Sequence, residues 1–456
     1  MARTKSPKGN NRIEYHHWDH SFRWTELHRS SEELRPLTVS WDKLADECVD
    51  IINGMPSGPS DTSKNPCKRD IYALLSANVD KNAKLKEFWT EINTVPEWVD
   101  WEQIKRGQDV FYRYAIPIII ALAFQSLLGG MGAPRVVETL SRTGGFSARV
   151  VRRRLLETVQ HTLDVTGSVN AMKPGGEGHV SSVRVRLLHS VVRLRILNLA
   201  IQQPDYYDKE KYGVPINDLD CIATINIFSS NVVWMGLPRQ GVYLSKQEIE
   251  DYIALWRLVA YYMGTPTEAW ENTEKAKAMM ESLLVSEIDP SETGKILAKN
   301  IILGLENTPP LYVSKELLEA ITRLLNGKDL SDELDIPRSS LYYRIIIYGY
   351  CFGVIIFSYM KPKSGFLDRK IIEWYRKYLR DIMIYRKDGL GGETLFDFKY
   401  LPTLTRTTRL GKRRTNLKWH GMKIMGLFGP FITLGLILFL GIGWYSISIA
   451  LSAISS

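Results

Sequence analysis

One stretch of the chain concentrates residue types that can hold a metal-centred cofactor. In VRVRLLHSVVRLR, residues 183–195, His189 lies among leucines and valines, so on a helix its ring would point towards or beside an apolar interior. Arg186 and Arg193 share a helix face and flank the histidine. A neutral imidazole in an apolar pocket can ligate haem iron, and nearby arginines can neutralise the haem propionates. A hydrogen-bonded core histidine is the competing interpretation.

A second group of residues could move protons. RRRLLETVQHT places Arg154 and Thr158 four residues apart on one helix face, with Glu157 beside them. Glu138, in RVVETLSRTGG, precedes Arg154 by sixteen residues. A buried carboxylate held by an arginine could act as a base, because its pKa depends on that partner and on desolvation. A structural ion pair would give the same pattern.

The N-terminal region offers a third candidate. His16, His17 and His20 crowd the sequence HHWDH, and His28 follows shortly after. On a helix, His16 and His20 would lie four residues apart, the spacing that a zinc-binding helix uses. No downstream cluster of cysteine, histidine or glutamate completes such a site, so packing of these side chains onto the body is the alternative.

Helical periodicity predicts the elements that must position these side chains. Ser245 and Glu248 form a capping box that opens an amphipathic helix over 249–263. Alternating strand patterns with hairpin turns are scarce, so we expect an all-α, globin-like domain large enough to enclose a cofactor. Further helical stretches are expected at 135–140, 148–163, 183–201, 219–235, 294–305, 315–325 and 369–385.

Three apolar runs could meet a membrane. Residues 424–456 contain no Lys, Arg, Asp, Glu or His, and 431–451 supply the roughly 20 residues that a bilayer-spanning helix needs. Residues 115–128 are too short and contain Pro117, so a buried core helix is expected there. Residues 345–360 are uncharged, and the sequence leaves open whether they enter the membrane.

The charge balance locates the basic residues. The 456 residues include 59 Lys+Arg against 50 Asp+Glu, a net charge of +9. Segments 1–12 and 402–423 hold eleven basic residues and no acid, so the body is close to neutral and a nucleic-acid partner is not expected. The seven basic residues of 402–423 precede the uncharged run and favour a cytosolic body with a C-terminal anchor. The four cysteines show no metal-binding spacing, and reduced, mostly buried thiols are expected.

These features divide the chain into four expected parts. A polar N-terminal segment and loop occupy 1–70, and the helical domain occupies 71–386. A basic juxtamembrane linker follows at 387–423, of which 387–412 is expected to be flexible. The transmembrane helix occupies 424–451.

Six motifs in order resemble one family of oxygenases. They are PEWVDWEQIKRGQDVFYRY, ETLSRTGG, RRRLLETVQHT, VRLLHSVVRLR, GVPINDLDCIATINIFSSNV and LSKQEIEDYIALWRLVAYYMG, and together they cover residues 98–264. The chain thus resembles the family that joins fungal membrane-bound mycophenolic-acid-type oxygenases to bacterial latex-clearing rubber oxygenases. The resemblance implies a helical, globin-like core that binds haem b and uses molecular oxygen.

The resemblance also implies roles for individual residues. His189 would be the axial iron ligand, and Arg154, Thr158 and Glu138 would lie on the distal side. Glu138 would be the base at the allylic position while dioxygen is added across a double bond, giving two carbonyl fragments. Where rubber oxygenases have a lysine that can cap the iron, this chain has Glu157, so lysine ligation is not available here.

Together these points predict a membrane-anchored haem oxygenase that acts on an apolar isoprenoid or polyketide-type substrate, in secondary metabolism. The expected location is the endoplasmic reticulum or another internal membrane. Two alternatives stay open: a non-haem metal oxidoreductase built on the N-terminal histidines, and a non-catalytic tail-anchored protein that binds a lipid or partner. The sequence does not specify the substrate, a redox partner, or a choice among cleavage, hydroxylation and desaturation.

Overall fold

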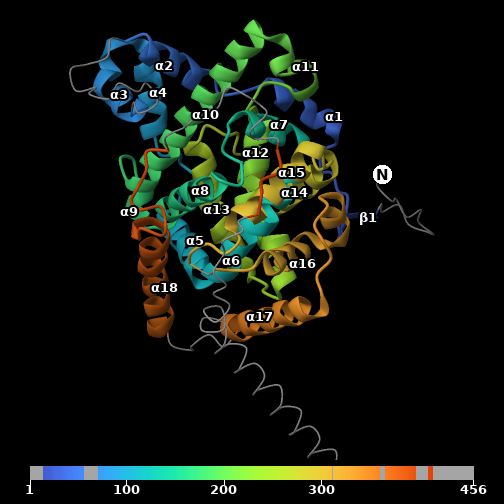
Figure 1. The fold of residues 1–456 in the computed structure, drawn as a ribbon. Helices are drawn as coiled ribbons and strands as arrows, with labels where there is room; N and C mark the ends of the chain where they lie inside the picture. Colours follow the sequence, from blue (N-terminus) through green and yellow to red (C-terminus); the bar gives the residue numbers. More distant parts are fainter. Residues whose placement is uncertain (1–13, 56–69, 311, 360–364, 397–408, 414–456) are drawn as a thin grey trace, which may run out of the picture.

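Helices make up most of the chain in the computed structural model, which describes residues 14–55, 70–310, 312–359, 365–396 and 409–413 (Figure 1). The α-helices are α1 (Ser31–Leu34), α2 (Lys43–Asn53), α3 (Ile71–Asn78), α4 (Ala83–Asn93), α5 (Trp101–Arg113), α6 (Ala115–Ile120), α7 (Pro134–Arg142), α8 (Val151–Thr166), α9 (Val169–Met172), α10 (Glu177–Gln202), α11 (Lys209–Tyr212), α12 (Asp218–Phe228), α13 (Lys246–Tyr262), α14 (Thr273–Ser286), α15 (Glu292–Leu305), α16 (Lys315–Glu333), α17 (Leu341–Tyr359) and α18 (Gly365–Arg380). Two short strands, β1 (Glu14–His17) and β2 (His20–Arg23), form an antiparallel hairpin. The prediction of a mostly helical protein is confirmed.

The helices predicted from periodicity are present. The capping box is formed as expected: the Ser245 hydroxyl accepts from the Glu248 backbone N–H, and the Glu248 carboxylate accepts from the Ser245 N–H. The stretch 219–235 is divided between α12 and the π-helical turn η7 (Val232–Gly236), and 369–385 between α18 and the π-helical turn η10 (Asp381–Tyr385).

The centre of the molecule is the crossing of α5 and α13. Gly107 of α5 lies against the backbone of Asp251, where a Cβ atom would clash with the Asp251 carbonyl oxygen. Trp256 and Tyr252 of α13 are fully buried in the large apolar cluster around this crossing. The absence of a side chain at Gly107 therefore allows the two helices to approach closely.

The N-terminal part packs onto the body instead of remaining a separate polar segment. Within 1–70, α2 buries Cys48, Val49 and Ile52 in a cluster that it shares with α3, α4 and α10. Figure 1 shows α2, α3 and α4 grouped beside one end of α10. Among the described residues, Cys48, Cys221 and Cys351 are free thiols, as expected.

Among the described residues, three helical segments are long and apolar enough to cross a membrane, and they differ in burial. Ala115–Gly132 and Asp218–Gln240 are each 61% buried inside the body, as expected for 115–128. Leu341–Tyr359, which is α17, is only 11% buried. The predicted anchor at 424–451 lies outside the described residues, as does most of the loop 52–69.

The described part of 387–412 contradicts the expected flexible connection. The Gln160 side chain of α8 donates to the Thr394 carbonyl and accepts from the Thr394 N–H, both at 2.9 Å. The Gly411 N–H donates to Asn300 of α15 at 2.8 Å. Phe396 is buried. Specific hydrogen bonds and one buried ring hold this segment on the body, which its Gly-rich composition did not indicate.

Candidate active site

A cavity of about 270 Å³ lies among α7, α8, α10 and α12, and part of its wall comes from the π-helical turn η4 (Ala121–Leu127) and from Phe396. Most of its lining is apolar. Its ionisable lining residues, apart from one thiol, are Arg154, Glu157, His161, His189 and Asp220. Residues that are distant in sequence thus converge on one apolar chamber, the usual arrangement of a small-molecule site.

His189 faces this cavity from α10, as predicted. Neither ring nitrogen has a hydrogen-bond partner among the described residues, although most buried imidazoles have one. Burial, followed by the positive charge of Arg193, lowers the pKa of His189 to about 3. The imidazole is therefore neutral at physiological pH and has a lone pair available for a metal ion.

Arg186 and Arg193, which were expected beside the haem propionates, do not line the cavity that His189 faces. Arg186 donates to both carboxylate oxygens of Asp42 and pairs with Glu91 at 2.8 Å. Arg193 pairs with the buried Asp46 and donates to three backbone carbonyls. Neither lines the cavity. Both guanidinium groups already neutralise carboxylates of the protein, and these contacts connect α10 to the N-terminal helices.

Arg154, Thr158 and Glu157 line the cavity from α8. Arg154 Nη1 donates to Glu157 Oε2 at 2.7 Å, and Arg153 Nε lies 3.2 Å from Glu157 Oε1. The Thr158 hydroxyl donates to the Arg154 carbonyl at 3.1 Å. The expected i,i+4 pairing of Arg154 and Thr158 on one face is present, and the buried carboxylate beside them belongs to Glu157.

Glu138 is not brought into the cavity. Its Oε1 lies 2.6 Å from Arg142 Nη2, one turn further along α7. The cavity-facing side of α7 is formed by Val136, Thr139 and Leu140. The sixteen-residue spacing to Arg154 placed Glu138 on the correct helix, but the rotation of that helix directs its carboxylate elsewhere.

His161 is a candidate that the sequence analysis did not single out. Its Nδ1 shares a hydrogen bond with the Ser181 hydroxyl at 3.0 Å, and its buried Nε2 has no partner among the described residues. Burial lowers the pKa of His161 to about 4. His161 follows Thr158 by three residues and Arg154 by seven, so helical spacing on α8 could have revealed it.

Asp220 of α12 is the second residue that was missed. Its Oδ1 accepts from Arg135 at 2.8 Å, while its buried Oδ2 has no partner among the described residues. Burial raises the pKa of Asp220 to about 6, although Arg135 opposes the shift. A carboxylate that titrates near neutral pH at an apolar cavity has the properties of a general base. The only signal in the sequence was its place in the motif INDLDC.

The N-terminal histidines are not on a helix, which contradicts the proposed zinc-type spacing. His16 belongs to β1 and His20 to β2, and in the hairpin register His17 pairs with His20. His20 Nε2 and His28 Nε2 each lie 3.0 Å from a different oxygen of Glu281 on α14. These two histidines therefore attach the hairpin to the body.

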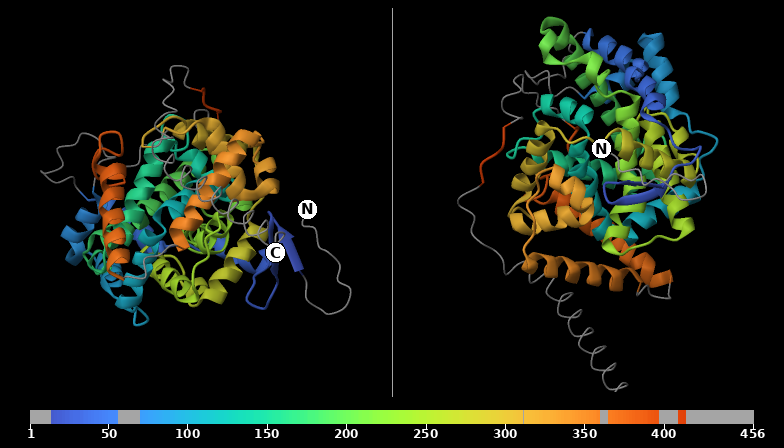
Figure 2. Two further views of the ribbon diagram at one scale, coloured as in Figure 1. Left: turned by 90° about the horizontal axis from the view of Figure 1, so that it is seen from below. Right: turned by 90° about the vertical axis from the view of Figure 1, so that its right-hand side faces the viewer.

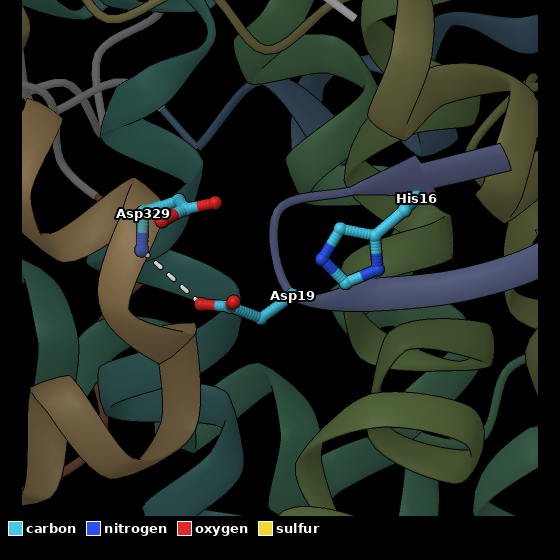
Figure 3. A group of neighbouring side chains, drawn as sticks. All are labelled: His16, Asp19 and Asp329. Carbon is cyan, nitrogen blue, oxygen red and sulfur yellow. Dashed lines mark hydrogen bonds between the residues drawn. The ribbon is translucent and has the colours of Figure 1, made fainter. Parts of the chain in front are cut away.

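His16, Asp19 and Asp329 form an exposed group near the hairpin turn (Figure 3). Asp19 Oδ2 accepts from the backbone N–H groups of Lys328 and Asp329, the second at 3.1 Å. His16 Nδ1 shares a hydrogen bond with Ser21 at 2.8 Å. The Asp19 carboxylate thus fixes the hairpin turn to the bend within α16, which is a structural role.

The cavity thus combines a neutral, unpartnered imidazole, a second imidazole and two carboxylates with a mostly apolar wall. The family described as "ER-bound oxygenase mpaB/B'/Rubber oxygenase, catalytic domain" matches residues 112–350. The chain belongs to this oxygenase family.

Individual relatives agree with the assignment. The chain is 22% identical over 264 residues to the rubber oxygenase of Streptomyces sp. (strain K30), covering 58% of this chain and 63% of the relative. It is 40% identical over 76 residues to aurantioclavine synthase of Penicillium expansum, covering 15% of this chain and 16% of the synthase. The structure of latex clearing protein in the closed state matches with a TM-score of 0.59 at 18% identity, over 79% of this chain and 94% of that one, and so shares its fold.

Proposed function

We propose that the protein is a haem b-dependent oxygenase that oxidises or cleaves a carbon–carbon double bond in an apolar isoprenoid or polyketide-type substrate. The observation that carries the proposal is His189, a neutral imidazole with both ring nitrogens unpartnered at the cavity of an oxygenase-family fold. His189 would hold the haem iron, and Arg154 lines the same cavity, where it pairs with Glu157. When bound, haem would supply the activation of dioxygen.

The residues of the chain would orient the substrate and handle protons. The apolar lining excludes water and holds a hydrocarbon chain by burial. Asp220 Oδ2 would accept an allylic proton, because its raised pKa and lack of a partner suit a base at neutral pH. The Arg154–Glu157 pair and the Thr158 hydroxyl would set the polarity of the opposite wall.

Glu138 remains the competing base, since the resemblance implies it, although it pairs with Arg142 outside the cavity. The two assignments of the base predict different effects of substitution on kcat. Asp220→Asn is expected to lower kcat by about a hundredfold or more, the usual contribution of a general base. Glu138→Gln is expected to leave kcat nearly unchanged. The reverse result would assign the base to Glu138, reached through a rearrangement of α7.

The type of reaction can be tested with isotopically labelled dioxygen and a polyprenyl substrate. Cleavage places one oxygen atom in each of two carbonyl products and needs no external reductant. Hydroxylation places one labelled oxygen atom in the product, whereas desaturation places none. Both reactions require electrons from a redox partner. We expect label in both carbonyl fragments without added reductant, and a single hydroxyl label would overturn cleavage.

The location is part of the proposal. The uncharged run 424–451, preceded by the basic segment 387–423, would anchor a cytosolic body to the endoplasmic reticulum or another internal membrane. An apolar substrate partitions into the same bilayer, so the anchor would bring enzyme and substrate together. The similarity to a fungal synthase supports a role in secondary metabolism.

A further inference from the structure

Helix α17 presents an apolar surface that no part of the described chain covers. Its side chains Leu341, Ile345 and Tyr348 are exposed by 70, 61 and 59%. Arg344 is its one charged residue. Soluble proteins seldom leave so long an apolar helix uncovered, and such a patch marks an interaction surface.

The opposite side of α17 is attached to the body along its length. Near its start, Ile347 packs in the cluster around α16. In the middle, the Tyr350 hydroxyl donates to Gln240 Oε1 at 2.7 Å, and at the end the Tyr243 N–H donates to the Tyr359 hydroxyl at 2.9 Å. These contacts hold one side of the helix against the body along its length. Figures 1 and 2 show it lying flat along one edge of the molecule.

A second cavity, of about 220 Å³, lies directly beneath α17. Its walls come from α6, α16, α17 and α18, and they are almost wholly apolar. Ile116 and Phe357 line it and are exposed by 37 and 44%, so the cavity reaches the surface beside α17. An opening with this lining favours a hydrocarbon chain.

The two cavities share a wall. Phe124 of η4 lines the cavity under α17, and Ser126 and Leu127 of the same turn line the cavity of His189. Phe124 also belongs to the apolar cluster that contains Phe146, which lines the His189 cavity. The turn η4 therefore lines both cavities with apolar side chains, Phe124 at the outer cavity and Leu127 at the inner one.

We infer that α17 lies in the surface of a lipid bilayer, parallel to it, and that the cavity beneath it takes an apolar chain directly from the lipid. Tyrosines at exposed positions suit the bilayer interface, and the basic residues Arg369, Lys370 and Lys377 of the neighbouring α18 suit anionic headgroups. The uncharged run 424–456 of the same chain would hold it at that bilayer. Docking of α17 on the bilayer does not depend on the proposed function, whereas delivery of an apolar chain to the inner cavity rests on it.

The docking can be tested with the full chain in vesicles of phosphatidylcholine and phosphatidylserine. A photoreactive benzoylphenylalanine replaces Ile345 or Tyr348, and Ile201 of α10, which is 79% exposed, provides the control position. We expect lipid adducts at 345 and 348 to exceed those at 201 severalfold. Equal adducts at all three positions on vesicle-bound protein, or adducts with a protein at 345 and 348, would overturn the inference.

The entry of a chain can be tested with phosphatidylcholine that carries a diazirine at the end of an acyl chain. The parent should be labelled at Ile116 and Val354, which line the cavity, and at the exposed Tyr348. Gly353→Phe or Gly349→Phe, which fill the cavity, should lose the label at Ile116 and keep it at Tyr348. The entry route would be overturned if Ile116 of the parent carried no label. It would also be overturned if both variants kept the same label at Ile116 as the parent. Neither result depends on bound haem, so a failure of the proposed function would be recognised separately.

Discussion

Burial sets the protonation states of individual side chains around the cavity. His189 and His161 are kept neutral by desolvation, whereas burial raises the pKa of Asp220. The cavity therefore contains neutral imidazole lone pairs and a carboxylate that titrates near neutral pH. The sequence identified His189 from its apolar neighbours. It could not identify Asp220, because the property that matters is an unpartnered oxygen set by the position of Arg135.

The depressed pKa of His161 predicts a pH dependence of stability. The folded value of about 4 lies below the ordinary value of 6.5, so the unfolded chain binds the proton more readily. The contribution of neutral His161 to the free energy of unfolding is complete above pH 6.5. This contribution falls by about 1.4 kcal/mol per pH unit as the pH drops towards 4. His161→Phe should flatten this dependence of the thermal midpoint.

Asp164 acts in the opposite direction, because burial raises its folded pKa to about 7 and favours folding at lower pH. Each variant is therefore compared with the parent at the same pH. An unchanged slope in His161→Phe would mean that the imidazole is not buried in the neutral form.

We expect Arg193 to stabilise the fold and not to bind haem. Arg193→Met leaves Asp46 buried without its partner, which typically costs about 3–5 kcal/mol. Arg193→Met combined with Asp46→Leu should recover much of the loss in thermal stability. The haem content of the folded fraction should be unchanged in both variants. A variant that folds normally but loses haem would instead place Arg193 at a propionate.

At the scale of elements, periodicity predicted the helices well but not their rotations or their partners. The spacing in α10 correctly placed Arg186 and Arg193 on one face. That face meets Asp46 of α2 and its N-cap Asp42, more than 140 residues away in sequence. The rotation of α7, which the sequence pattern did not specify, likewise keeps Glu138 out of the cavity. The hairpin at 14–23 was missed because the histidines of HHWDH were interpreted at helical spacing, whereas Trp18 and Asp19 adopt positive φ angles and form a turn.

The close crossing of α5 and α13 predicts a strong effect of one methyl group. Gly107→Ala would force the Cβ atom against the Asp251 carbonyl and should destabilise the fold by about 3 kcal/mol. Gly365→Ala at the start of α18, where the added atom meets open space, is the matched control. Equal thermal midpoints for the two variants would show that α5 and α13 can separate without cost.

The segment at 390–396 should depend on Gln160. Gln160→Ala removes the two hydrogen bonds to the Thr394 backbone, each contributing about 1 kcal/mol, and a longer one from the Thr394 hydroxyl. Limited proteolysis should then cut within 387–396 faster than in the parent. Gln202→Ala, at the exposed end of α10, should leave the rate unchanged. Identical cleavage of all three proteins would mean that the other contacts of the segment, such as Glu393 with Arg380 and the buried Phe396, hold it without Gln160.

For the whole molecule, the family, the helical class and the position of His189 were predictable, because they follow from local patterns in the correct order. The two cavities and the flat attachment of α17 were not, since they arise from contacts between distant helices. Within the described chain, Arg186 and Arg193 of the same helix as His189 pair with carboxylates of the protein. The exposed apolar surface lies on α17.

The central claim is that His189 holds a haem in this fold. The most direct measurement is the absorption spectrum of the detergent-solubilised full chain, compared with two histidine variants on the same helix. His179 is also buried on α10, but it bonds to the Ile92 carbonyl at 2.7 Å, away from the cavity. We predict a Soret band in the parent and in His179→Ala, and its loss in His189→Ala. A parent without a Soret band, or full haem content in His189→Ala, would contradict the account.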